Sequence, residues 1–164
     1  MRHLALIIIT VLLIVSSSLG YAYHEKRTEV DDAKNGLISV SNTALFCLAD
    51  IGALEKMLEN NASDGAVWSR VSQYAYCAVT LEKAAFFLYL LNEDENYWRL
   101  HVADSNLEVY LHTAMNSQNP LEKISDNMEL INKISREINR ILQRGGVKVA
   151  LSVFIWVINI ESAI

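Results

Sequence analysis

Residues 67–91, VWSRVSQYAYCAVTLEKAAFFLYLL, decide the expected fold of this chain. Apolar side chains recur here every three or four residues, which is the spacing of one face of an α-helix. The positions on this stripe are Val71, Tyr74, Ala78, Leu81, Ala85 and Leu88. Residues 84–91 are apolar on every side, so we expect this helix to be the most buried one of the fold.

Residues that break regular structure are rare, because the 164 residues include one proline and six glycines. Many short strands would need more turns than that, so the composition predicts long helices and an all-α fold. The predicted helices cover about 37–60, 64–92, 95–116 and 120–144. Short connections make consecutive helices antiparallel neighbours, which gives an up-down four-helix bundle over residues 37–144.

Capping and turn residues mark the predicted helix ends. Ser63 lies within the polar run ENNASDG (59–65) and is a suitable N-cap for the second helix. Asn119 and Pro120 begin the fourth helix, with Glu122 placed for a capping box, and Gly145-Gly146 ends it. The first helix is expected to bury Leu37, Val40, Ala44, Cys47, Ile51, Leu54 and Leu58.

The first 23 residues are predicted to be a transmembrane signal anchor. Residues 4–23, LALIIITVLLIVSSSLGYAY, are long enough to span a bilayer core, and Tyr21 and Tyr23 suit its interface. Residues 24–36 form a charged connector that is expected to be helical. The alternative is a cleaved signal peptide, with cleavage near Ala22 and a secreted product.

The C-terminal residues 147–164 are predicted to be a second, short transmembrane helix. Their apolar core, 149–160, would cover only about 18 Å of a hydrocarbon layer of about 30 Å. A buried terminal helix of the bundle is the main alternative, since Asn159 is costly in lipid, and a strand is another. The basic residues that flank the two apolar segments favour a bundle in the cytoplasm, but long segments translocate largely regardless of their charge. The signal-like start therefore carries more weight, and we expect a two-pass cell-membrane protein with its bundle outside the cytoplasm.

The two cysteines are a candidate disulfide. Cys47 and Cys77 each lie 15 residues from Ala62, in the predicted turn between the first two helices. Because the two cysteines are the same number of residues from the turn, they lie opposite each other in an antiparallel helical hairpin, as a disulfide requires. Two buried free thiols remain the alternative. The same turn holds Asn61-Ala62-Ser63, which matches a glycosylation acceptor but is a tripeptide expected often by chance.

The best candidate for chemistry is one polar helix face. His101, Glu108 and His112 share it with Ser105, and Asp104 lies at its edge. Imidazole and carboxylate at this spacing are able to bind a transition metal. The apolar residues of this helix lie on the opposite side, and no other helix supplies a Glu-x-x-His partner. We therefore interpret the face as solvated and predict no metal site, cofactor or catalytic residue.

Other functions are constrained by what the sequence lacks. It has no Gly-rich phosphate loop, His-Glu-x-x-His or Gly-x-Ser-x-Gly motif, so an enzyme is not expected. The net charge of −5 and the lack of clustered Lys and Arg exclude nucleic acid as a partner.

The expected function is that of a membrane-anchored binding or interaction module, sensor-like or scaffold-like. Its predicted layout resembles the sensor halves of bacterial and archaeal chemoreceptors in architecture alone. The expected partners are the lipid bilayer and another membrane protein or a second copy. An alternative is a structural subunit of a larger membrane complex that docks through residues 84–91 and the C-terminal segment. A metal-dependent bundle enzyme is a third hypothesis, and it requires another chain to cover the polar face.

Overall fold

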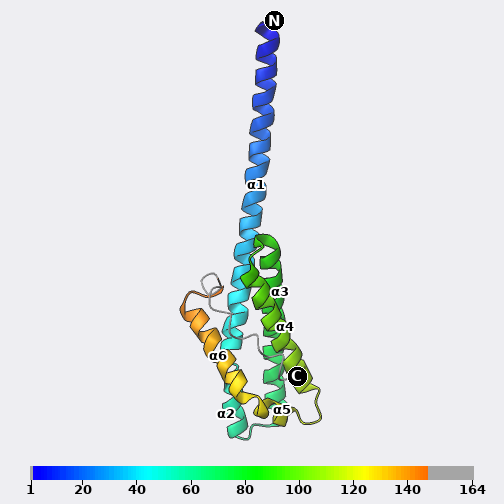
Figure 1. Cartoon of the computed structure of the whole chain (residues 1–164), viewed down its shortest axis with the longest axis vertical. Helices are drawn as coiled ribbons and strands as arrows, with labels where there is room; N and C mark the ends of the chain where they lie inside the picture. The colour runs from blue at the N-terminus through cyan, green and yellow to red at the C-terminus, as the bar shows by residue number, and fades with distance from the viewer. Residues whose placement is uncertain (1, 148–164) are drawn as a thin grey trace. The chain divides into compact units, whose positions relative to one another are not determined.

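The computed structural model describes residues 2–147, with side chains from residue 10 onward. Every regular element in this range is a helix, which confirms the all-α prediction (Figure 1). The six helices of this range are α1 (Arg2–Ala49), α2 (Ala53–Glu59), α3 (Asp64–Asn92), α4 (Glu95–Met115), α5 (Pro120–Asp126) and α6 (Met128–Gln143). Apart from Val147, the predicted C-terminal membrane segment lies outside the described residues.

The chain divides into two compact units, Met1–Gly36 and Leu37–Ile164, and the boundary falls within α1. In the first unit, the described residues 2–36 are helical throughout, including the charged connector 24–36. Apolar side chains from Val11 to Leu19 are exposed there. Two stretches of the described chain, Thr10–Glu59 and Asp64–Asn92, are long and apolar enough to cross a membrane.

The second unit has a helical core to which α3 and α4 together contribute about half of the large buried side chains. All six stripe residues of α3 are buried, as are Leu100, Ala103, Leu107, Tyr110, Leu111 and Ala114 of α4. The predicted stripe of α1 is wrong in part, because Val40 is exposed while Ile38, Leu45 and Leu48 are buried. The reason is that α1 is covered on two sides, by α3 through Cys47 and by α6 through Ala49. The buried face therefore centres between these two contacts.

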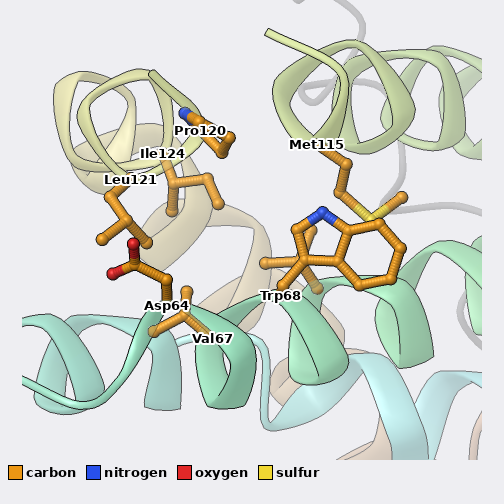
Figure 2. Close-up of a pocket in the computed structure, with 8 residues that line it drawn as sticks. Asp64, Val67, Trp68, Met115, Pro120, Leu121 and Ile124 are labelled. Carbon is orange, nitrogen blue, oxygen red and sulfur yellow. The ribbon is translucent and has the colours of Figure 1, made fainter. Parts of the chain in front are cut away.

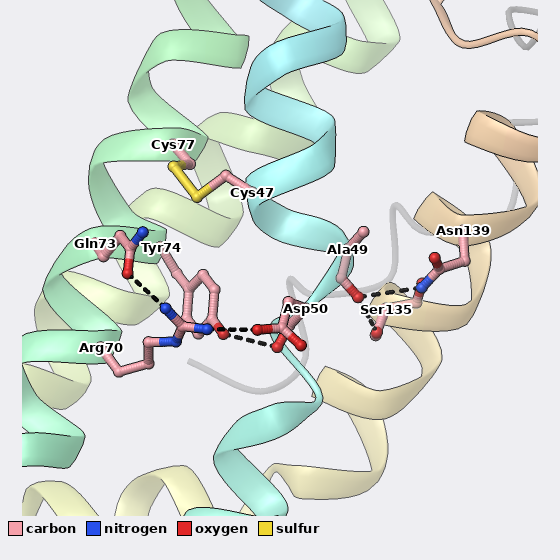
Figure 3. Close-up of polar contacts among 9 residues, drawn as sticks. All are labelled: Cys47, Ala49, Asp50, Arg70, Gln73, Tyr74, Cys77, Ser135 and Asn139. Atoms are coloured by element: carbon pink, nitrogen blue, oxygen red, sulfur yellow. Dashed lines mark hydrogen bonds and ion pairs between the residues drawn. A yellow bond between two sulfur atoms is a disulfide. The ribbon is translucent and has the colours of Figure 1, made fainter.

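The helix predicted over 37–60 is interrupted after Ala49, where the chain turns into α2. Side chains from distant helices bind the carbonyl groups at this break (Figure 3). Ser135 Oγ and Asn139 Nδ2 of α6 donate to the Ala49 carbonyl at 2.6 and 3.1 Å. The Tyr74 hydroxyl of α3 donates to the Asp50 carbonyl at 2.7 Å. These bonds replace helix bonds that would otherwise be lost, and so the break is stabilised by tertiary contacts.

A glycine at this break lets α6 approach closely. A Cβ on Gly52 would lie 3.1 Å from Asn132 Oδ1 and 3.3 Å from Ser135 Oγ. The helix predicted over 120–144 is interrupted as well, at Asn127, between α5 and α6. There the Lys123 carbonyl accepts from the side chains of Tyr110 (3.1 Å) and Asn127 (3.0 Å). Both interruptions thus occur where side chains bind the carbonyls that end a helix.

Two of the predicted helix ends are confirmed in detail. Ser63 is the N-cap of α3, and its hydroxyl accepts from the Ala66 amide at 3.4 Å. Gly145 and Gly146 adopt positive φ angles of 103° and 75°, and the Gly146 amide donates to the Ile141 carbonyl at 3.0 Å. This arrangement is the usual glycine-dependent end of an α-helix.

Residues 84–91 are apolar on every side in sequence but only partly buried in the structure. Phe87, Leu90 and Leu91 are exposed, while Ala84, Ala85 and Leu88 in the same turns are buried. Among the described residues, helix α3 packs along its length against α4 and contacts α1 across the Cys47–Cys77 link (Figure 1). The described residues leave the side that carries Phe87, Leu90 and Leu91 uncovered.

Candidate functional site

A cluster of titratable side chains is buried between α3 and α4. Glu82 and Asp104 are only 6% and 4% exposed. His101 Nδ1 lies 3.1 Å from Glu82 Oε1, and Lys83 Nζ lies 2.8 Å from Glu82 Oε2. The imidazole and the carboxylate are not aligned as a hydrogen bond, so we treat their contact as an ion pair when His101 is protonated. We call Glu82, His101 and Asp104 the polar cluster.

Asp104 is the unusual member of the polar cluster. Its Oδ2 atom is buried and has no hydrogen-bond partner within the described residues. Burial raises the pKa of Asp104 well above its ordinary value of 3.8, and the nearby Glu82 carboxylate adds to the rise. An ionised carboxylate without a partner is costly in a low-dielectric interior, so this environment favours the protonated acid.

Aromatic rings enclose the imidazole of the polar cluster. The ring centroids of Phe86 and Trp98 lie 5.2 and 5.0 Å from that of His101. Tyr89 in turn contacts Trp98 with a centroid separation of 5.4 Å. Helical spacing explains this arrangement, because Glu82, Phe86 and Tyr89 share the face of α3 that meets α4.

The predicted solvated face of α4 is therefore wrong for two of its members. His101 and Asp104 turn toward α3, where Glu82 meets the imidazole. Glu108 and His112 remain nearer the surface, with Glu108 Oε1 and His112 Nε2 3.5 Å apart. Sequence reasoning missed Glu82, although a lone acidic residue between apolar turns of α3 was a usable signal. Within the described residues, no group of three or more His, Cys, Asp or Glu side chains could hold a metal ion.

The polar cluster places a buried carboxyl group with a raised pKa, Asp104, close to a second carboxylate. Its members are carboxyl groups and an imidazole, and the described cavities at Trp68 and beside the disulfide are lined by other residues.

Cys47 and Cys77 are joined by a disulfide, with an S–S distance of 2.08 Å and Cα atoms 6.3 Å apart (Figure 3). The bond links α1 to α3 about one turn from Asp50 and two turns from Arg70, which form an ion pair. The Arg70 guanidinium also lies 5.2 Å from the Tyr74 ring centre. A groove of about 290 Å³ runs beside the disulfide, lined by Ser39, Val40, Thr43, Ala44, Thr80 and the two cysteines.

A mainly apolar surface lies on the same two helices as this groove, and we call it the apolar face. It consists of Val40, Phe46, Tyr76, Phe87 and Leu91, all exposed, with Phe46 and Tyr76 at 66% and 72%. Residues 35–49 of α1 include no charged side chain, and residues 71–92 of α3 include only Glu82, which is buried, and Lys83. A soluble domain rarely leaves a contiguous surface of this kind without a partner.

A separate small cavity lies between the start of α3, the C-terminal end of α4 and the first residues of α5 (Figure 2). Its volume is about 60 Å³, and Asp64, Trp68, Met115, Pro120, Leu121 and Ile124 are among its lining residues. Of these residues, Trp68 lies off the apolar stripe predicted for α3, so the sequence predicts that it either lines a cleft or, in the favoured interpretation, packs against a neighbouring helix. The glycosylation candidate Asn61 is exposed in the turn before α3, with a φ of 51°.

No family model, no curated protein and no solved structure matches this chain.

Proposed function

We propose that this protein is a membrane-anchored helical bundle whose second unit binds a protein partner outside the cytoplasm. The N-terminal segment would form the anchor, and the exposed apolar side chains from Val11 to Leu19 suit a lipid environment. The Cys47–Cys77 disulfide suits an oxidising compartment, since cytosolic thiols are normally kept reduced. Secretion after cleavage near Ala22 is the alternative placement.

The apolar face is the observation that carries the proposed binding role. It extends over two helices, it includes two aromatic side chains more than 60% exposed, and Lys83 is the only exposed charged residue within residues 35–49 and 71–92. Covering such a surface gains about 25 cal/mol for each Å² of apolar area removed from water. Another membrane protein or a second copy of this chain would provide that cover.

The course of the chain supports a two-pass arrangement. Val147 is 2% exposed, and its amide donates to Asn42 Oδ1 in α1 at 2.9 Å. The chain therefore leaves the described residues near the point where Leu37 begins the second unit. A membrane segment within 147–164 would then start at the same end of this unit, as a two-pass topology requires.

Cell fractionation combined with protease protection tests the anchor and its sidedness. We expect the full chain, first residue intact, in the membrane fraction, with the second unit digested only from the non-cytoplasmic side. Recovery of the intact chain as a soluble monomer without detergent would contradict the proposal. A soluble product that begins near Tyr23 would support secretion instead.

Surface variants test the binding role. Exchange of Tyr76 and Phe87 for serine should abolish cross-linking of the second unit to its partner in intact membranes. Exchange of Val109 for serine, an exposed apolar residue of α4 outside the apolar face, is the matched control and should leave the cross-link unchanged. If both variants cross-link as the parent does, the apolar face is not the binding surface.

The second candidate function is a structural subunit of a larger membrane complex. It is favoured by the continuation of the apolar face to Phe87 and Leu91, the segment that the sequence identified as a docking surface. A stable stoichiometric complex after detergent extraction would favour this role, whereas a reversible, concentration-dependent association would favour the module. We propose a binding role in both cases and no enzymatic one.

A further inference from the structure

The cavity in Figure 2 combines apolar walls with one negative charge. Val67, Val71, Met115, Leu121 and Ile124 supply apolar walls from three helices. Asp64 is the only charged residue in its lining. The cavity belongs entirely to the second unit and is separate from both the polar cluster and the apolar face.

Two side chains of α3 set the chemistry of this cavity. Asp64 and Trp68 are four residues apart on one helix, so they lie on the same face, and Figure 2 shows both projecting toward α4 and α5. Trp68 is 51% exposed, which leaves part of its indole ring available to a ligand. Asp64 forms no ion pair within the described residues, so no protein cation competes for its carboxylate.

The charge and the indole select the same kind of ligand. A carboxylate repels anions and attracts cations, and an indole face attracts cations through its quadrupole. The apolar walls disfavour a strongly hydrated ion such as sodium, because they offer no oxygen ligands to replace its water. A cation that carries its charge on an apolar, methylated group satisfies all three features.

The size of the cavity limits the ligand to a small group. Its volume is about 60 Å³. In this measure one water molecule needs about 10–15 Å³, so the space holds a group of about four or five heavy atoms. That is the size of a trimethylammonium head.

We propose that this cavity is a binding site for a quaternary or methylated ammonium group, held between the Trp68 indole and the Asp64 carboxylate. The apolar walls contributed by Met115, Leu121 and Ile124 receive its methyl groups. This site is additional to the protein-binding role and does not depend on it.

A matched pair of compounds tests the proposal. Choline and 3,3-dimethylbutan-1-ol have nearly the same shape, but only choline carries a charge. The full chain with Trp98→Phe and Trp156→Phe, in a maltoside detergent, retains Trp68 as its only fluorophore of this type. Each compound is titrated against Trp68 emission at constant ionic strength, with sodium chloride as the salt control. We expect saturable binding of choline at millimolar concentrations and binding of the alcohol about 2- to 5-fold weaker.

Variants separate the contributions of charge and shape. Asp64→Asn should weaken choline binding about 2- to 5-fold and leave the alcohol unaffected. Glu129→Gln removes an exposed acidic residue from α6, outside the cavity, and should change neither titration. Leu121→Phe fills part of the cavity and should weaken the binding of both compounds. Circular dichroism checks that each variant keeps its helix content.

Three outcomes would overturn the proposal. The first is the absence of a saturable response to choline. The second is equal affinity for choline and the alcohol, which would show that the cavity does not recognise charge. The third is an equal loss of choline binding in Asp64→Asn and Glu129→Gln, which would reduce the effect to net charge.

Discussion

The cross-link between α1 and α3 leads to a quantitative prediction. The disulfide joins residues 30 apart in sequence, and the chain-entropy relation for a loop of this length gives a stabilisation of about 3.6 kcal/mol. Residual structure in the unfolded hairpin would lower this value, so we expect the exchange of Cys47 and Cys77 for serine to cost about 2–4 kcal/mol.

Urea denaturation of the full chain in detergent measures this cost, with tryptophan emission reporting on the second unit. Typical urea slopes for small domains are about 1–3 kcal/mol/M, so the midpoint should fall by about 1 M or more. Reducing agent should lower the midpoint of the parent by a similar amount and leave that of the double serine variant unchanged. This second comparison separates the cross-link from the effect of the serine side chains.

Two results would refute the reasoning. Two alkylatable thiols in the denatured, unreduced protein would show that the cross-link is absent. A midpoint unchanged by reductant in a protein with no free thiol would show that α1 and α3 are held equally well without it. The entropic account of this hairpin would then be wrong.

Further predictions concern single side chains of the second unit. Asp104→Asn should raise stability at pH 7, because the buried acid has a raised pKa and its ionisation disfavours the folded state. For the same reason the free energy of unfolding of the parent should fall as pH rises from about 4 through the folded pKa of Asp104, by about 1.4 kcal/mol per unit of pKa shift. The Asp104→Asn variant should lose less stability over this range, and denaturation at a series of pH values measures the difference. Gly146→Ala should destabilise the fold by at least about 1–2 kcal/mol, since φ is +75° and a Cβ would clash with Asn42 Oδ1. Thermal melts measure this loss, and Gly65→Ala is the control because a Cβ there meets nothing within 4 Å. Ser135→Ala should cost about 0.5–1.5 kcal/mol through the lost bond to the carbonyl that ends α1, and a urea midpoint equal to that of the parent would contradict this.

Local features of the second unit were predictable because they depend on neighbouring residues along the chain. The apolar stripe of α3 and the serine cap at its start follow from helical period and side-chain chemistry. The glycine stop after α6 has a similar local cause, since two consecutive positive φ angles are costly for other residues. The equal distances of Cys47 and Cys77 from the turn predicted that they lie opposite each other. That spacing did not distinguish a disulfide from two free thiols.

Which neighbouring helix, if any, covers a given helix face could not be predicted in the same way. Periodicity places His101 and Asp104 on one side of α4, but Glu82 of α3 covers that side only because the two helices pack there. Periodicity likewise makes residues 84–91 apolar all round, whereas exposure of Phe87 and Leu91 depends on how many helices surround α3.

By itself the sequence determined that the described part of the chain is helical, where α3 and α4 begin and end, and which residues of α3 form its buried stripe. The tertiary structure alone decided the breaks after Ala49 and at Asn127, the buried side of α1 and the inward turn of the polar cluster. The physical reason is that hydrogen bonding and periodicity within a helix involve residues three or four apart. The partners that end a helix or cover its face, such as Ser135 for Ala49, come from segments 86 residues away.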